Sequence, residues 1–274
     1  MLHFEEEQKI RRKMEDLKQL LANLGSIAIA FSGGVDSTFL LKVSYEVLGE
    51  KAIAITAQSS SFPRRELEEA KTFCQKEGVS QVIFPFHELE IEGFEKNPPD
   101  RCYLCKKTFL KKVQQIAAEK EIAYVAEGSN IDDEEDYRPG MRAVEELGII
   151  SPLRKVGLSK REIRFLSKEL ELDTWEKPSF ACLSSRFPYG ESITKEKLAR
   201  VEQAEQLLLD LGFSQFRVRI HGDMARIEIL PKEFPRLLQE ENRQQVIEQL
   251  KSYGFAYIAM DLAGYRMGSM NEVL

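Results

Sequence analysis

The stretch Ser32-Gly33-Gly34-Val35-Asp36-Ser37 lies between an apolar run at residues 27–31 and a second apolar-rich run at residues 38–43. This order predicts a strand, a glycine-rich turn and a helix. Adjacent glycines let a backbone approach a ligand closely, and the helix turns its free N–H groups and positive dipole end toward the loop. Such a loop binds phosphate, with hydroxyl donors from Ser32 and Ser37 and with Asp36 as a ligand for hydrated Mg²⁺.

This loop differs from the Walker A motif, because no Gly-Lys-Ser/Thr follows at the required spacing. It resembles the PP-loop of the ATP pyrophosphatase superfamily, whose members cleave ATP to AMP and pyrophosphate and adenylate a carbonyl or carboxylate oxygen. The resemblance implies an ATP/Mg²⁺ site at Ser32, Gly33, Gly34, Asp36 and Ser37. The alternative is an ordinary glycine-rich turn between a strand and a helix.

Length and composition narrow the class of protein. The 274 residues are enough for one large or two ordinary domains, and a hydrophobic content of 43% supports a sizeable core. The net charge of −6 argues against a broad nucleic-acid interface. Residues 1–12 do not resemble a signal peptide, and no apolar run is long enough for a membrane span. We therefore expect the four cysteines to be in a reducing cytoplasm.

Apolar patterning predicts an α/β fold. The predicted strands are residues 27–31, 51–57, 81–84 and 122–126, and the predicted helices are residues 5–24, 64–77 and 100–120. Strands that alternate with helices form a parallel sheet, and ligands bind at the carboxyl ends of its strands. Gly128, which follows the fourth strand, is therefore expected at the nucleotide site. Ser159 and Glu162 are predicted to form a capping box that opens another helix.

A domain boundary is predicted near residue 190. Residues 1–190 form a parallel-sheet PP-loop domain of the Rossmann type, similar to adenine nucleotide alpha hydrolases. Residues 191–274 change to a small α+β domain with an antiparallel hairpin, expected to bind substrate and to support oligomerisation. Its predicted helices are residues 194–211 and 234–253, and its predicted strands are residues 215–220, 225–230 and 255–260.

Cysteine spacing indicates a metal or sulfur site. Cys102 and Cys105 form a Cys-x-x-Cys, and Cys182 lies in an irregular stretch at residues 178–190. Three thiolates can hold a [4Fe–4S] cluster with one iron free of protein. A fourth ligand would favour structural zinc, and a redox pair is the third possibility. Cys74 lies on an apparently regular helix and is predicted to be a buried apolar residue.

Five motifs together resemble the LarE family over essentially the whole chain. They are the PP-loop, Arg-Cys-Tyr-Leu-Cys-Lys at residues 101–106, Glu-Gly-Ser-Asn-Ile-Asp-Asp at 127–133, Pro-Ser-Phe-Ala-Cys-Leu-Ser-Ser-Arg at 178–186 and Gly-Tyr-Arg-Met-Gly-Ser-Met-Asn at 264–271. The resemblance implies an ATP-dependent sulfur transferase that helps to build the nickel-pincer nucleotide of lactate racemase. Such enzymes adenylate a carboxylate of pyridinium-3,5-biscarboxylic acid mononucleotide and replace an oxygen with sulfur.

The family has two subtypes that differ in their sulfur source. In one, a single cysteine matching Cys182 gives up its own sulfur and becomes dehydroalanine. In the other, three cysteines are thought to bind a [4Fe–4S] cluster that carries a donated sulfide. Because Cys102 and Cys105 accompany Cys182, this chain resembles the cluster subtype, with Cys182 and Asp36 as its catalytic residues.

The hairpin of the second domain carries candidate substrate-binding residues. Alternation of apolar and charged residues in its strands is by itself typical of one buried and one solvated face. The family resemblance instead implies that Arg217, Arg219 and Arg266 bind phosphate and that Glu228 contacts metal or substrate. Arg186 is expected to neutralise AMP or substrate phosphate, and its alternative role is a salt bridge within the loop.

The function predicted from the sequence is a cytoplasmic sulfur transferase. It would use a small-molecule nucleotide and a sulfide or sulfur donor, assemble as a homo-oligomer, and bind no nucleic acid or membrane. Three rival functions are a tRNA thiolation enzyme, an amidating ligase of the NAD-synthetase type and a non-catalytic nucleotide-binding protein. The acidic balance opposes the first, the three cysteines oppose the second, and the intact loop hydroxyls with Asp36 oppose the third.

Overall fold

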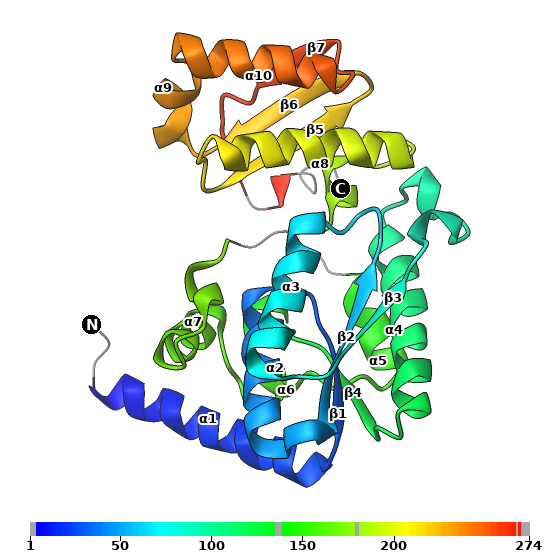
Figure 1. Cartoon of the computed structure of the whole chain (residues 1–274), viewed down its shortest axis with the longest axis vertical. Helices are drawn as coiled ribbons and strands as arrows, with labels where there is room; N and C mark the ends of the chain where they lie inside the picture. The colour runs from blue at the N-terminus through cyan, green and yellow to red at the C-terminus, as the bar shows by residue number, and fades with distance from the viewer. Residues whose placement is uncertain (1–3, 135–138, 179–180, 267, 270–274) are drawn as a thin grey trace. The chain divides into compact units, whose positions relative to one another are not determined.

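The structure is a computed structural model that describes residues 4–134, 139–178, 181–266 and 268–269 (Figure 1). The chain divides into two compact units. The first comprises Met1–Ser59, Arg64–Phe86 and Asp100–Ser179, and the second comprises Ser60–Pro63, His87–Pro99 and Phe180–Leu274. Residues 191–274 thus belong to one unit, and the predicted domain boundary near residue 190 stays a prediction.

A four-stranded parallel sheet forms the centre of the first unit, as predicted. Its strands are β1 (Ile27–Ala30), β2 (Ala52–Gln58), β3 (Gln81–Pro85) and β4 (Tyr124–Ala126), in the order β3-β2-β1-β4. Ile27 pairs with Ala52 on one side and with Tyr124 on the other. The central position of β1 brings the loops after β1 and β4 to the same edge of the sheet.

Helices cover both faces of this sheet, because its side chains are apolar on both faces. One core joins Ile27 and Ile29 of β1 to α1 (Phe4–Leu24), α2 (Val35–Leu48), α3 (Arg64–Glu77), α6 (Pro152–Lys155) and α7 (Lys160–Glu169). The other core joins Ala28 to α4 (Arg101–Glu119) and α5 (Gly140–Glu146). Cys74 is 2% exposed in the first core, where burial raises its pKa to about 12, so its predicted role as a buried apolar residue is confirmed.

The second unit is a three-stranded sheet with helices. The hairpin of β5 (Phe216–His221) and β6 (Met224–Ile229) is antiparallel, as predicted, and β7 (Tyr257–Met260) pairs with β6 in parallel. Helix α8 spans Lys195–Asp210. In the residues that the structure describes, the short 3-10 segments are Gly49–Lys51, Glu88–Glu90, Phe94–Lys96, Ile131–Glu134, Asp173–Glu176, Leu183–Arg186 and Pro231–Glu233.

The prediction of one helix over residues 234–253 is wrong. The structure has α9 (Phe234–Leu237) and α10 (Glu240–Ser252), separated by Leu238 and Gln239, and the ψ of 140° at Gln239 lies outside the helical range. The side-chain amide of Asn242 donates a hydrogen bond of 2.8 Å to the carbonyl of Arg236. In a continuous helix this carbonyl would accept a backbone hydrogen bond. The Asn242 amide replaces that bond, so the break in the helix leaves no unpaired carbonyl at Arg236.

None of the helices in the described residues is both long enough and apolar enough to cross a bilayer.

Candidate active site

The phosphate loop, which is the predicted PP-loop at residues 32–37, is held in shape by close backbone packing. Gly33 has φ of +66°, and a Cβ built there would lie 3.2 Å from Cβ of Ala70 on α3. Glycine is required at this point for two reasons. Other residues rarely adopt this positive φ, and a side chain would also crowd the neighbouring helix. Helix α2 begins immediately afterwards, with Gly34 as its N-cap. The N–H groups of its first turn are therefore directed at the loop.

Ser32 and Ser37 brace the same turn. Their hydroxyl oxygens are 3.1 Å apart, and the Ser37 hydroxyl donates to the carbonyl of Gly34 at 3.2 Å. The N–H of Gly34 donates to the Ser32 hydroxyl at 3.4 Å. The two hydroxyls thus link both ends of the loop and lie beside the N–H groups that would receive a phosphate.

Asp36 forms an ion pair with a residue that sequence reasoning missed. Its Oδ2 accepts a hydrogen bond from Nζ of Lys160, the first residue of α7. Its Oδ1 is buried and has no hydrogen-bond partner among the described residues. Burial raises the pKa of Asp36 above its ordinary value, and the positive charge of Lys160 offsets only part of that effect. The unsatisfied oxygen suits a cation, because hard carboxylate oxygens are preferred ligands of Mg²⁺.

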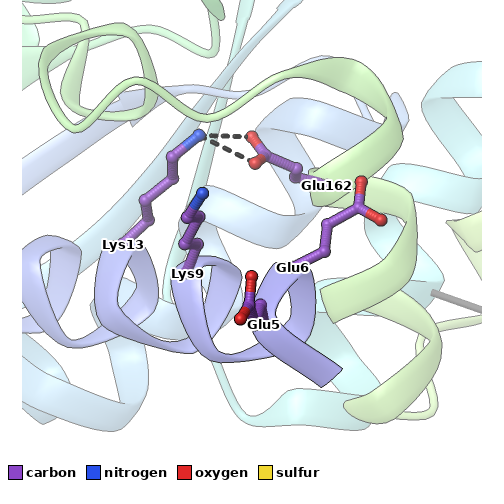
Figure 2. Close-up of a pocket in the computed structure, with 5 residues that line it drawn as sticks. All are labelled: Glu5, Glu6, Lys9, Lys13 and Glu162. Atoms are coloured by element: carbon purple, nitrogen blue, oxygen red, sulfur yellow. Dashed lines mark hydrogen bonds and ion pairs between the residues drawn. The ribbon is translucent and has the colours of Figure 1, made fainter. Parts of the chain in front are cut away.

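Local contacts fix the position of Lys160. The predicted capping box is confirmed, since Ser159 and Glu162 exchange side-chain to backbone hydrogen bonds at the start of α7. Lys13 of α1 donates to both carboxylate oxygens of Glu162, at 2.7 and 2.8 Å (Figure 2). Lys13 and Glu162 line an open pocket together with Glu5, Glu6 and Lys9. The Lys13–Glu162 pair supports the end of the helix that presents Lys160 to Asp36.

Lys177 is a second lysine at the loop that sequence reasoning missed. Its Nζ donates to the carbonyl of Gly33 at 3.1 Å and lies 2.7 Å from Oε2 of Glu66 and 2.5 Å from Oε2 of Glu69. Nη2 of Arg164 donates a hydrogen bond of 2.8 Å to the carbonyl of Lys177. Lys177 therefore ties the backbone of the loop to α3.

Gly128 lies against the first turn of α2, as the sheet topology predicts. A Cβ at this position would be 3.0 Å from N of Ser37 and 3.3 Å from Cβ of Asp36. Beyond it, the side chain of Asn130 accepts from N of Asp132 at 2.9 Å, and Asp132 accepts from N of Lys160 at 2.8 Å. The segment after β4 therefore packs between the phosphate loop and α7.

Glu127, the residue before Gly128, is buried and fully engaged. Its Oε2 accepts from Nζ of Lys106 at 2.9 Å and from the Ser129 hydroxyl at 2.7 Å, and its Oε1 accepts from the Ser151 hydroxyl at 2.6 Å. Burial raises the pKa of Glu127, but Lys106 and the two hydroxyls outweigh that effect and leave the pKa below its ordinary value. An acidic residue directly after a buried strand was the signal that could have revealed it.

The cysteines lie in both units. Cys102 is exposed and Cys105 is half-buried near the start of α4, in the first unit, where Nη2 of Arg101 lies 3.6 Å from Sγ of Cys102. Cys182 is exposed in the second unit, and its carbonyl accepts from N of Ser185 at 2.9 Å. No group of three or more His, Cys, Asp or Glu in the described residues is arranged to hold a metal ion. The expected three-cysteine cluster stays a prediction.

The charged face of the hairpin is buried, so the solvated-face interpretation is wrong. Arg219 is 5% exposed and Glu228 is fully buried, and they form a two-pronged ion pair with distances of 3.1 and 2.9 Å. Arg219 also donates to the carbonyl of Ser185 at 2.8 Å and to the Ser269 hydroxyl at 3.0 Å. Segments distant in sequence thus cover this face, which strand alternation alone does not reveal.

Arg217 and Arg266 have different surroundings. Burial, followed by the positive charge of Arg186, lowers the pKa of Arg217 to about 10. The Arg217 guanidinium carbon lies 5.1 Å from the centre of the Tyr265 ring. Arg266 is more exposed and lies 3.8 Å from Oδ1 of Asp261. The carboxylate of Glu205 offsets part of the lowering of the Arg217 pKa, so Arg217 already has one anion in its surroundings.

Arg186 forms a salt bridge, but its partner lies on a helix and not within the loop that the alternative role named. It is fully buried, and two of its nitrogens each lie 2.8 Å from the carboxylate of Glu205 on α8. It also donates to the carbonyls of Ala181 and Cys182, at 2.8 and 3.2 Å. Arg186 therefore anchors the Cys182 segment to α8, and its expected role in binding phosphate stays a prediction.

Parts of two sequence motifs lie outside the described residues. They are Ser179, Phe180, Met267, Met270 and Asn271.

Known proteins resemble this chain over nearly its whole length, although no family model matches it. A pyridinium-3,5-bisthiocarboxylic acid mononucleotide synthase of Lactiplantibacillus plantarum is 38% identical over 263 residues, which are 96% of this chain and 95% of the relative. An uncharacterized protein of Synechocystis is 43% identical over 97% of this chain and 99% of the relative. A glutamine-hydrolyzing GMP synthase subunit of Methanocaldococcus jannaschii is 25% identical over 75% of this chain and 69% of the relative.

The Gly128→Ala substitution tests the close approach to α2. The added methyl group would displace the segment from Ser37, so we expect the affinity for a non-hydrolysable ATP analogue to fall about tenfold or more. Calorimetric titration measures this. Gly148→Ala is the control: it places alanine at φ of +63° with open space around the Cβ, so stability should fall while affinity is retained. Equal affinities in wild type and Gly128→Ala would contradict the packing argument.

Glu127→Gln tests the charge of the buried carboxylate. Because the folded-state pKa of Glu127 is lowered, its ionised form stabilises the fold above its ordinary pKa of 4.5, and this contribution is lost as pH falls through the folded-state pKa. We expect Glu127→Gln to lower the free energy of unfolding by about 1.5–3 kcal/mol at pH 7 and by less at acidic pH. Urea denaturation from pH 7 to pH 3.5 measures the difference. A deficit that stays constant over this range would exclude ionisation as the cause.

Proposed function

Because this chain belongs to the LarE family, that of the Lactiplantibacillus plantarum synthase, we propose that it converts a carboxylate of pyridinium-3,5-biscarboxylic acid mononucleotide into a thiocarboxylate. The chain is a sulfurtransferase of the adenylating type, and we place its product in the biosynthesis of the nickel-pincer cofactor of lactate racemase. The observation that carries the proposal is the phosphate loop with Asp36 at its helix start, in a chain that aligns almost end to end with that synthase.

The reaction requires activation because a carboxylate oxygen is a poor leaving group. A carboxylate oxygen attacks the α-phosphorus of ATP, which forms an acyl-adenylate and releases pyrophosphate. A sulfur nucleophile then attacks the acyl carbon, and AMP leaves with the former carboxylate oxygen. Thiolates and sulfide are effective nucleophiles at neutral pH, so no further activation of the sulfur is needed.

We assign the triphosphate to the loop in the first unit. The N–H groups of Gly34 and of the first turn of α2 would bind phosphate oxygens, with the Ser32 and Ser37 hydroxyls beside them. Asp36 would hold Mg²⁺ through the oxygen that has no hydrogen-bond partner among the described residues. Bound there, Mg²⁺ would stabilise the charge of the departing pyrophosphate. Lys160, released from Asp36, would be a second positive charge for the phosphates.

We assign the phosphate of the substrate to the second unit. Arg217, Arg219 and Arg266 are the candidate ligands, and the positive charges of Arg186 and Arg219 near Arg217 support an anion there. Glu228 would act through Arg219, because the two already form a two-pronged ion pair. Arginine suits this task because its planar fork matches two phosphate oxygens.

We propose that Cys102, Cys105 and Cys182 together hold a [4Fe–4S] cluster. Soft sulfur donors suit such a cluster, and Cys102 and Cys182 are exposed while Cys105 is half-buried. When bound, the cluster would supply the sulfur atom for transfer. An external sulfide or sulfur donor would restore it, and the reducing cytoplasm would keep the thiols available. We further propose that the working form is a homo-oligomer.

Asp36→Asn tests the adenylation step. The substitution should reduce the substrate-dependent release of pyrophosphate at least about 100-fold, because Mg²⁺ loses a negatively charged ligand. The fold should survive, since burial already favours the neutral form of this side chain. Asp16→Asn, on the exposed side of α1, is the matched control and should retain activity. Pyrophosphate release by Asp36→Asn at the control rate would remove Asp36 from the mechanism.

Single serine substitutions test the cluster. Iron and sulfide are measured after anaerobic purification. Serine at Cys102, Cys105 or Cys182 should abolish iron binding, because each removes one ligand, whereas Cys74→Ser should retain it. Supplied with sulfide, the wild type should turn over repeatedly. Stoichiometric zinc in the wild type, or undiminished iron in the Cys102→Ser/Cys105→Ser double variant, would contradict this proposal.

A further inference from the structure

Glu127 connects two parts of the first unit, the phosphate loop through its backbone and helix α4 through its side chain. Its backbone continues into Gly128, which lies against Ser37 and Asp36 at the phosphate loop. Its carboxylate accepts from Nζ of Lys106 on α4 at 2.9 Å. A single buried residue therefore connects the edge of the nucleotide loop to the helix that carries the Cys-x-x-Cys.

The carboxylate is held firmly enough to transmit a displacement. Besides Lys106, it accepts from the Ser129 hydroxyl, the Ser129 N–H and the Ser151 hydroxyl, at 2.7, 3.1 and 2.6 Å. The Glu127 side chain is 8% exposed. A buried carboxylate with every hydrogen bond made cannot move without moving its partners, since an unpaired buried charge is costly.

Lys106 lies close to both cysteines of α4. It follows Cys105 directly and lies four residues after Cys102, which places it one helical turn further along the same side of the helix. Its stem passes Gly140 of α5, where a Cβ would lie 3.0 Å from Cδ of Lys106. Glycine at position 140 thus leaves the space that Lys106 needs to reach Glu127.

We propose that Glu127 is a positioning residue that couples nucleotide binding at the phosphate loop to the reactivity of Cys102 and Cys105. The proposal rests on the proposed function in one respect, that the loop binds ATP. Phosphates that enter the first turn of α2 press on Gly128, and Glu127 passes the displacement through Lys106 to the first turns of α4. The two sites thereby communicate within one unit.

Cysteine alkylation with and without nucleotide tests the coupling. The full chain is freed of bound metal and kept reduced, and iodoacetamide labelling of Cys102 and Cys105 is followed by mass spectrometry with and without Mg²⁺ and α,β-methylene-ATP. In the wild type we expect the analogue to change the labelling rate about fivefold or more. In Glu127→Gln the change should be less than about twofold, although calorimetry shows the analogue still bound.

Two further variants keep the test decisive. Lys106→Met removes the same ion pair from its more exposed side, so it should lose the coupling even if Glu127→Gln fails to fold. Glu146→Gln is the matched control, because it breaks the neighbouring ion pair between Lys107 of α4 and Glu146 of α5, in which neither Lys106 nor Glu127 takes part. It should retain the wild-type response. A merely structural role for Glu127 would change stability and leave the response to nucleotide intact.

The outcomes separate this inference from the proposed function. A wild-type chain that binds the analogue but labels at an unchanged rate overturns the coupling alone. A full response in both Glu127→Gln and Lys106→Met overturns the role of this ion pair. A wild-type chain that does not bind the analogue overturns the proposed function and the coupling with it.

Discussion

The close approach of Gly128 to the first turn of α2 is the contact on which the site of the first unit depends. It exists because β4 pairs with β1, so the segments that follow both strands leave the sheet at the same edge. Only glycine fits at position 128, because a Cβ there would lie 3.0 Å from the backbone N of Ser37. This contact places the segment that carries the buried Glu127 beside Asp36 and the phosphate loop, and α7 then completes the site by presenting Lys160.

Compensated buried charges are the second theme of the molecule. In the first unit, lysines pair with Asp36, Glu127 and Glu66 around the loop. In the second unit, arginines pair with Glu205 and Glu228. Such pairs add little net stability over apolar residues of similar volume, because desolvation of both charges offsets their attraction. Their value here is positional, because each holds a loop or a strand in place, and in the proposed mechanism the Lys160–Asp36 pair would open when Mg²⁺ binds.

Much of the fold follows from local sequence signals, while the partners of the site residues do not. The phosphate loop, the parallel strands, the capping box and the burial of Cys74 each depend on neighbours in the sequence, and all were predictable. The partner of Asp36 lies 124 residues away, and Lys177 lies 144 residues from Gly33, so no local pattern identifies them. The hairpin shows the same limit. Alternation correctly separates its two faces, but the cover over Arg219 comes from Ser185 and Ser269, which distant segments supply.

Transfer of a heavy-oxygen label tests the central claim most directly. The biscarboxylate mononucleotide is labelled in its carboxylate oxygens and incubated anaerobically with the chain, ATP, Mg²⁺ and sulfide. If the chain adenylates the carboxylate and then replaces oxygen with sulfur, AMP will carry one labelled oxygen for each thiocarboxylate formed. Mass spectrometry reads both products in one sample. Thiocarboxylate accompanied by unlabelled AMP, or labelled AMP without any sulfur in the product, would contradict the account.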